Sequence, residues 1–449
     1  MANEPDEQEH VEPPATRQGA QLKLIQDELP DVGVDPPDWE RTQDVRYLYR
    51  EGSVLVRDRD LERVIAVFET RDVAESEGRI IGGLISGLTR YVHPEVQNPV
   101  LPSTLAALRL VDDAVGVGVA TPDHVLYVSD ETGVSPCPAT EPEEVPGTAE
   151  PDPRVSTDRC DGQGVLVSVV DTGLNKAEAQ AHAWLAGVDG DSEIVFLPDG
   201  TIRPYAGHGT FIAGVVRSMA PKAEVYVDGV FTHAGATYES ELVPQLDQAL
   251  SRNPDILSLS AGTPTRRDLT LLGFDVLFEE RLRDRKGFLL VAAAGNGGER
   301  RQLWPAAFPW VLSVGGLSAN WRSRATFSNY GSGVDVYAPA TDLVNAYATG
   351  RFVCNEPPHA NEAREFQGMA RWSGTSFSTP LVAGLIAARM SGTGESPRQA
   401  ADALLAVALR QAVPGVGPVL LPGQACGVHD DGRGGCSCRH SGHCCCSAR

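Results

Sequence analysis

Short apolar runs alternate with longer segments of helical periodicity from residue 164 onward. This alternation predicts a parallel sheet with helices on both faces, because the strands of such a sheet are buried from both sides. The predicted strands are 165–170, 224–227, 256–260, 288–293, 311–314 and 334–337. The predicted helices lie near 209–217, 240–251, 269–285, 377–390 and 397–410. Functional side chains of such sheets gather beyond the carboxyl ends of the strands.

A smaller globular pattern precedes this sheet, at residues 45–130. It combines predicted strands at 53–56 and 125–128 with predicted helices at 60–69 and 104–111. The expected fold class is therefore α/β, a three-layer parallel sheet with helices on both faces, preceded by a small α+β N-terminal domain.

Segments without clear periodicity separate and flank these domains. Residues 1–44 form an acidic leader with eleven Asp and Glu in the first 40 positions against Arg17 and Lys23, and disorder is favoured over an acidic interaction tail. A linker rich in proline and glutamate is expected to be extended, exposed and open to cleavage. The expected division is leader 1–44, small domain 45–130, linker 131–160, larger domain 161–415 and Cys/His-rich tail 416–449.

The net charge excludes several classes of partner. The formal charge is −22 at pH 7, and a polyanion is repelled by nucleic acid and by anionic membranes. No apolar run approaches the ~20 residues that a membrane helix needs. Residues 1–12 lack the basic and apolar regions of a secretory signal. We therefore expect a cytoplasmic protein without nucleic-acid or membrane partners, with non-standard secretion left open.

The nine cysteines are unevenly placed, six of them after residue 425. A core of this size needs no disulfide, so the distribution favours a reducing compartment. The tail also contains histidines, and Cys and His together are common metal ligands. Because three adjacent cysteines fit zinc-binding spacings poorly, a disordered, oxidation-prone tail is favoured over a metal site.

Four segments carry residue types suited to acyl transfer. An apolar strand runs into Asp171, which places a carboxylate at the carboxyl edge of the sheet. His208 stands between glycines ahead of an apolar helix, and Ser376 stands at the start of another, where free N–H groups and the helix dipole favour negative charge. Asn296 follows strand 288–293, and its amide can donate to an oxyanion. Each segment alone is as well explained by a turn or a structural residue.

In their order and spacing, the four segments resemble the subtilisin family of serine peptidases. Asp171 and His208 are 37 residues apart, and His208 and Ser376 are 168 residues apart. The resemblance implies a serine endopeptidase that hydrolyses peptide bonds of protein or peptide substrates through an acyl-enzyme. In this scheme Ser376 attacks the carbonyl, His208 transfers the proton and Asp171 orients His208. Asn296 and the Ser376 N–H group would bind the oxyanion.

The resemblance covers about residues 164–410, including further matching stretches at 304–315 and 327–332. It also implies a substrate pocket for the residue before the cut, with walls formed by Ser260, Ala261 and Gly262 and by Ala294 and Gly295. No charged residue lies in these walls, so an apolar preference is expected, and Ala261 stands where the family more often has leucine, which would widen the pocket. No cofactor is required by the resemblance. Calcium dependence stays open, because no clear cluster of acidic ligands is visible.

By position and size, the 45–130 domain resembles the inhibitory propeptide of the family. The resemblance implies that this domain occupies the cleft until self-cleavage within 136–160 releases the enzyme. A permanent recognition domain is the alternative. For the whole chain, the alternatives are a catalytically silent peptide-binding protein and a peptidase whose N-terminal domain is displaced by a partner. Residues 350–371 resemble an insertion before Ser376. A surface loop is the favoured interpretation of this insertion, and a cover for the cleft is the alternative. Cys354 within it is expected to be an inert thiol.

Overall fold

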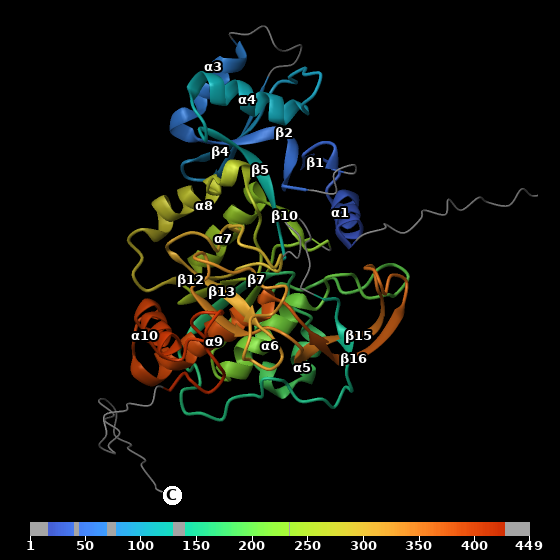
Figure 1. Cartoon of the computed structure of the whole chain (residues 1–449), viewed down its shortest axis with the longest axis vertical. Coiled ribbons are helices and arrows are strands. Elements are labelled where there is room, and N and C mark those ends of the chain that lie inside the picture. The colour runs from blue at the N-terminus through green and yellow to red at the C-terminus, as the bar shows by residue number, and fades with distance from the viewer. Residues whose placement is uncertain (1–16, 40–44, 70–77, 129–139, 233, 427–449) are drawn as a thin grey trace, which may run out of the picture.

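The computed structural model describes residues 17–39, 45–69, 78–128, 140–232 and 234–426 (Figure 1). Its largest sheet has seven parallel strands in the order β14-β13-β12-β11-β7-β9-β8. These strands are β7 (Leu166–Asp171), β8 (Asp189–Gly190), β9 (Glu224–Gly229), β11 (Ile256–Leu259), β12 (Leu289–Ala293), β13 (Val311–Leu317) and β14 (Val336–Pro339). The predicted parallel sheet is confirmed.

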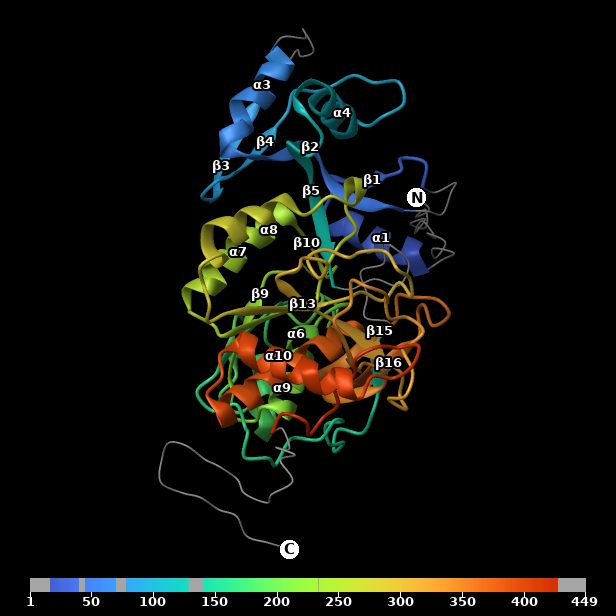
Figure 2. The same ribbon diagram turned by 60° about the vertical axis from the view of Figure 1, so that its left-hand side comes forward.

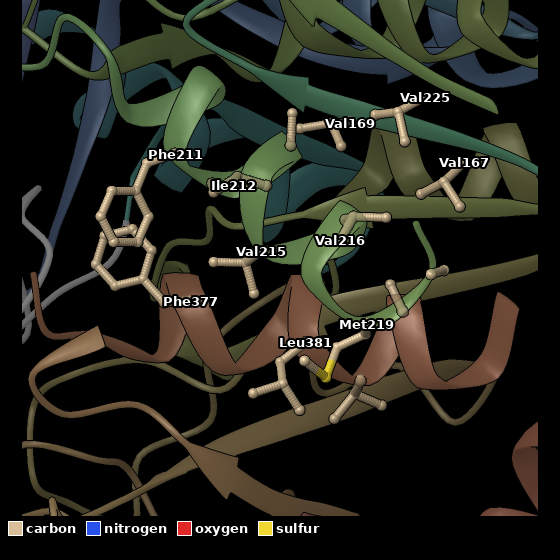
Figure 3. Packing of buried hydrophobic residues seen from close by; sticks show 14 of the residues in the cluster. Val167, Val169, Phe211, Ile212, Val215, Val216, Met219, Val225, Phe377 and Leu381 are labelled. Atoms are coloured by element: carbon tan, nitrogen blue, oxygen red, sulfur yellow. The ribbon is translucent and has the colours of Figure 1, made fainter. Parts of the chain in front are cut away.

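Helices cover both faces of this sheet. Successive strand residues point to opposite faces, so Val291 of β12 packs in one buried cluster while Leu290 and Ala292 pack in another. The helices of the first face are α6 (His208–Met219) and α9 (Thr375–Thr393), and those of the second are α7 (Glu239–Ser251) and α8 (Leu272–Leu277). Figure 3 shows the apolar side chains between α6 and α9, where the rings of Phe211 and Phe377 lie 4.6 Å apart. Predicted helices on both faces are thus confirmed.

Shorter elements complete the larger domain. Helix α10 (Pro397–Arg410) packs against α9 and begins with a capping box at Ser396. The remaining elements are β6 (Glu143–Glu144), α5 (Lys176–Ala181), η2 (Ala183–Leu185), β10 (Ala236–Tyr238), η3 (Arg266–Asp268), η4 (Phe278–Leu282), β15 (Leu343–Val353) and β16 (Ala363–Trp372). Strands β15 and β16 form a hairpin, so much of the predicted insertion at 350–371 is regular sheet.

The smaller domain lies at the end of the molecule opposite α9 and α10 (Figure 2). Its elements are β2 (Tyr47–Arg57), η1 (Asp58–Asp60), α3 (Leu61–Glu69), β3 (Arg79–Ile85), β4 (Leu88–Val92), α4 (Ser103–Val115) and β5 (Ala120–Tyr127). The antiparallel sheet has the order β10-β5-β2-β4-β3, and α3 and α4 pack on it through a buried apolar cluster. Because β10 belongs to the larger domain, one sheet runs across the boundary between the two domains.

The described part of the leader is folded, which corrects the expectation of disorder over residues 1–44. It contains α1 (Arg17–Glu28) and β1 (Val32–Asp35), and β1 pairs with β2. Leu22 and Ile25 of α1 are fully buried in a cluster shared with β5 and β10. Their spacing of three residues places both on one helix face, a pattern masked in the sequence by the surrounding acidic residues and prolines. Residues 1–16 and 40–44 lie outside the described part of the chain.

The described part of the predicted linker is also not a free connector. Strand β6 pairs with β16, and Asp152 exchanges two backbone hydrogen bonds of 2.9 Å with Val344. The indole N–H of Trp372 donates to the carbonyl of Thr140. Residues 140–160 are therefore attached to the larger domain, whereas 131–139 lie outside the described residues. The proline- and glutamate-rich composition predicted an exposed linker. Composition does not show that a sheet edge is available for this segment to pair with.

Cys160 and Cys426 form a disulfide that joins the start of the larger domain to its end, 266 residues later. Of the six cysteines after residue 425, Cys426 alone lies in the described region, so the expectations for the remaining tail are not addressed. The expected reducing compartment stays a prediction, and this disulfide counts against it because disulfides persist mainly in oxidising compartments. Within the described residues, no helix has the length and apolar character needed to cross a membrane.

Candidate active site

Asp171 and His208 are brought together by the crossover from β7 to α6. Asp171 is the last residue of β7 and His208 is the first residue of α6. Nδ1 of His208 lies 2.7 Å from Oδ1 of Asp171, and both residues are fully buried. Gly207 precedes the histidine with φ = 84°, and a Cβ there would lie 2.8 Å from the Tyr347 ring. Glycine is thus required for the turn that aims the imidazole at the carboxylate.

Ser376 occupies the first turn of α9, where backbone N–H groups lack helical partners. Its neighbour Phe377 lies against the imidazole of His208, with ring centroids 5.4 Å apart, and Trp372 contacts the same imidazole edge-on at 5.4 Å. These contacts place the start of α9 beside the His208 ring.

Three polar atoms of Asp171, His208 and Ser376 are buried without a hydrogen-bond partner in the described part of the structure. They are Oγ of Ser376, Oδ2 of Asp171 and Nε2 of His208, the ring nitrogen opposite the one that faces Asp171. A buried, unpaired polar group costs about 1–3 kcal/mol, and such exceptions in folded proteins call for a functional explanation. The arrangement leaves a hydroxyl and an imidazole nitrogen available for proton transfer.

Asn296 contacts the residue directly before Ser376. It follows β12, and its Oδ1 accepts hydrogen bonds from the backbone N–H of Thr375 at 2.8 Å and from the Thr375 hydroxyl at 2.9 Å. Thr375 directly precedes Ser376. The amide oxygen of Asn296 is therefore occupied by two donors of the residue that precedes Ser376.

The two predicted pocket walls both adjoin Ser376. The Ser260 hydroxyl donates a 2.8 Å hydrogen bond to the carbonyl of Ser376, and Gly295 directly precedes Asn296. Ala261 and Ala294 are buried beside them. The structure thus brings together all nine of the site residues predicted from the sequence, because the carboxyl ends of β7, β11 and β12 lie at one edge of the sheet.

A strand of the smaller domain lies along one of these walls. Tyr127, at the end of β5, donates to the carbonyl of Gly262 at 3.1 Å and accepts from its N–H group at 2.9 Å. On its other side β5 pairs with β10, and Val128 N–H donates to the carbonyl of Gly235. The sequence did not predict β10, since three residues with no apolar alternation give no strand signal.

Sequence reasoning also missed Glu193. Its Oε2 accepts the N–H group of Gly207 at 2.9 Å, directly before His208, and its carboxylate bonds the Thr172 hydroxyl, directly after Asp171. Burial raises the pKa of Glu193 to about 8, against the lowering effect of these two hydrogen bonds, and the nearby Asp171 raises it further. Glu193 lies in an irregular loop with no motif around it, so only the folded chain reveals its position.

Metal-binding residues do not gather in the described part of the chain, where no group of three His, Cys, Asp or Glu side chains is arranged to hold an ion. Calcium dependence therefore remains open. Burial raises the pKa of the Cys354 thiol to about 12, and the nearby Glu141 adds to the shift. Since the thiolate is the reactive form, this cysteine matches the inert thiol expected from the sequence.

The family model of the subtilases matches residues 162–418, more than half of the chain. The chain belongs to the subtilase family. The resemblance drawn from the sequence is thereby confirmed. This subtilase is 29% identical over 238 residues to M-protease of Shouchella clausii, with 50% of this chain and 54% of that protein covered.

Other relatives show the same range of similarity. The subtilase is 29% identical over 238 residues to Subtilisin Savinase of Lederbergia lenta, covering 50% of this chain and 76% of that protein. It is 28% identical over 235 residues to a thermostable alkaline protease of Halalkalibacterium halodurans, covering 50% and 56%. A solved cold-adapted subtilisin-like serine proteinase is 22% identical, with a TM-score of 0.45, and covers 60% of this chain and 92% of that one. The chain spans about half the length of most of these curated relatives.

Proposed function

We propose that this subtilase is a serine endopeptidase with Ser376 as its nucleophile. The observation that carries the proposal is the buried Asp171–His208 hydrogen bond with two unpaired atoms, Ser376 Oγ and His208 Nε2, at the same edge of the sheet. A catalytically silent peptide-binding protein would have no use for these two unpaired groups, whose burial costs stability. Family membership supports the same choice.

The proposed reaction follows from the contacts of each residue. Ser376 Oγ attacks the peptide carbonyl carbon and its proton passes to Nε2 of His208, while Asp171 holds Nδ1–H and stabilises the imidazolium. The carbonyl oxygen becomes an oxyanion, to which the Asn296 amide and the Ser376 backbone N–H donate. Collapse breaks the C–N bond, and the imidazolium proton leaves with the amine. Water then hydrolyses the acyl-enzyme by the same proton transfers.

We further propose that the smaller domain inhibits the larger one. Tyr127 of β5 forms an antiparallel bridge with Gly262, two residues after Ser260, whose hydroxyl donates to the Ser376 carbonyl. A substrate added as a strand on the same wall would compete directly with β5. A permanent recognition domain would leave this wall accessible, so the contact favours inhibition.

The position of self-cleavage is narrowed by the same contacts. Residues 140–160 are attached to the larger domain, whereas β5 ends at Tyr127 beside the site. We therefore propose that the chain is cut within 129–139, upstream of most of the stretch expected from composition. Sequencing the new amino terminus of the processed protein would identify the bond, and a cut between 140 and 160 would contradict this placement.

Replacement of Ser376 by alanine tests the proposed function. Wild-type protein should lose mass by self-cleavage and should gain the mass of a serine-directed phosphonate, whereas Ser376→Ala should do neither. Ser378→Ala is a matched control, because Ser378 is equally buried in α9 but its hydroxyl donates to the Thr375 carbonyl. Labelling of Ser376→Ala, or no labelling of the wild type, would refute the proposal. Full activity of the intact, uncleaved chain would refute inhibition alone.

A further inference from the structure

Leu303 fills the slot between the two walls of the proposed substrate pocket. A Cβ built on Gly262 would lie 2.6 Å from Cδ2 of Leu303, and a Cβ built on Gly295 would lie 3.0 Å from the same atom. One methyl group therefore contacts both walls. Leu303 is only 6% exposed, yet it belongs to none of the hydrophobic core clusters formed by the described residues. Its side chain is buried by the pocket walls and not by the core.

The backbone on either side of Leu303 is held in place. Trp304 exchanges backbone hydrogen bonds of 2.8 and 3.0 Å with Thr263, the residue after Gly262. The Leu303 carbonyl accepts from Ala307 N–H at 2.9 Å, and the Trp304 ring packs edge-on against Phe308 at 4.6 Å. These bonds fix the backbone of Leu303 against the Gly262 wall, so its side chain starts from a fixed position beside the slot.

The slot opens onto the reacting groups. Ser260, at one wall, is bonded to the carbonyl of Ser376, and Gly295, at the other, precedes Asn296. An extended chain already pairs with Gly262, in the form of Tyr127. The side chain next to a carbonyl held at Ser376 therefore enters the space between these walls, where it meets Leu303.

Resting on the proposed peptidase function, we propose that Leu303 restricts cleavage to bonds that follow a small residue, glycine, alanine or serine. Well-packed sites resist added volume, because neighbouring side chains must leave their rotamers to make room. A leucine or phenylalanine before the cut would overlap the Leu303 methyl groups. The small size of Ala261 predicted a wider pocket. Its side chain, however, is 1% exposed and packs in the buried cluster on the α7 face of the sheet. The general apolar preference expected from the sequence is thereby narrowed to small residues.

Peptides that differ only in the residue before the cut test this assignment on the processed protein. Wild-type enzyme should favour alanine over phenylalanine by about 10- to 100-fold in kcat/KM, the range that hydrophobic pockets achieve. Leu303→Ala and Leu303→Gly should reduce that ratio by a similar factor, mainly by improving the phenylalanine peptide. Leu404→Ala is the matched control, because Leu404 is a fully buried leucine of α10, in the core of the first face; its ratio should equal that of the wild type.

The wild-type preference needs no variant, so it remains decisive even if Leu303→Ala does not fold. Equal cleavage after alanine and phenylalanine by the wild type would overturn the role of Leu303 while leaving the peptidase proposal intact. An unchanged ratio in folded Leu303→Ala would do the same. Absence of both hydrolysis and phosphonate labelling in the wild type would overturn the proposed function, and this inference with it.

Discussion

Removal of the Asp123 carboxylate should release the smaller domain from the proposed active site. Asp123 lies in β5 and is fully buried at the contact with α7. Its two oxygens accept the backbone N–H of Ser240 at 2.9 Å and the Ser240 hydroxyl at 2.7 Å, and Arg50 lies 3.5 Å away. Ser240 is in the first turn of α7, where its N–H has no helical partner. One carboxylate of the smaller domain thus satisfies the larger domain's helix terminus.

The size of the effect follows from what Asp123→Ala leaves behind. The Ser240 N–H loses its acceptor in a buried position, and Arg50 loses its buried counter-charge while keeping exposed partners at Asp31 and Glu241. Arg50 and Asp123 both belong to the smaller domain, so their ion pair is lost in the docked and undocked states alike. The cost to docking is that of the buried Ser240 donors left without an acceptor, about 1–3 kcal/mol. With about 1.4 kcal/mol for each factor of ten, the undocked fraction should rise by about 5- to 150-fold.

The assay is the rate at which a phosphonate labels Ser376 in freshly purified chain, with intact mass distinguishing cleaved from uncleaved species. If labelling requires undocking, its rate follows the undocked fraction. Asp123→Ala should be labelled about 5- to 150-fold faster than wild type, whereas Asp113→Ala, which changes an exposed aspartate of the same domain, should be labelled at the wild-type rate. A folded Asp123→Ala protein that is labelled within a factor of about two of wild type would refute the docking energetics derived from this contact.

Three further outcomes are expected. Burial raises the pKa of Glu193 to about 8, so its contribution to the free energy of unfolding is fully present below its ordinary pKa of about 4.3 and is lost as pH rises through about 8. In Glu193→Gln, the free energy of unfolding should therefore change less with pH over that window than in the wild type. The same pH dependence in both proteins would contradict this. Reduction of Cys160–Cys426 should lower the unfolding free energy by about 5.6 kcal/mol in the chain-entropy model for its 266-residue separation, and an unchanged denaturation midpoint would disprove it. Ile25→Ala should lower the free energy of unfolding by about 2–5 kcal/mol through lost packing and should increase the rate of Ser376 labelling, whereas Lys23→Ala, at an exposed position, should do neither. Equal labelling rates in Ile25→Ala and wild type would exclude a role of α1 in holding the two domains together.

The leader helix gives that last expectation its structural basis. Leu22 and Ile25 of α1 share a buried cluster with Tyr127 of β5, the strand that lies along the pocket wall, and with Tyr238 of β10, which pairs with β5. Gln21 of the same helix donates to Glu356 and accepts from the Tyr205 hydroxyl, both in the larger domain. The leader therefore holds the smaller and larger domains together at the position where they meet.

Much of the proposed site could be predicted from the sequence because its determinants are local. A buried apolar strand that ends in a polar residue, or a glycine-flanked polar residue that begins an apolar helix, specifies where that residue lies on its own element. Parallel strands bring their carboxyl ends to one edge, so Asp171, Asn296 and Ser260 had to meet there. Packing of the helices that begin at His208 and Thr375 on the same face of the sheet then brings His208 and Ser376 to that edge.

Only the tertiary structure decided which distant segments become neighbours. Residues 140–160 have the composition of a linker, but residues 143–144 pair with the edge of β16 and Asp152 pairs with Val344. Glu193 and Leu303 stand in segments without periodicity or motif, and their positions depend on loops closing over the Asp171 and Gly262 edges. The local pattern determined the strands and helices around the parallel sheet and the residue types of the proposed site. The proposed inhibition, the proposed pocket size and the covalent closure by Cys160–Cys426 depend on contacts between residues far apart in the chain, which local periodicity does not encode.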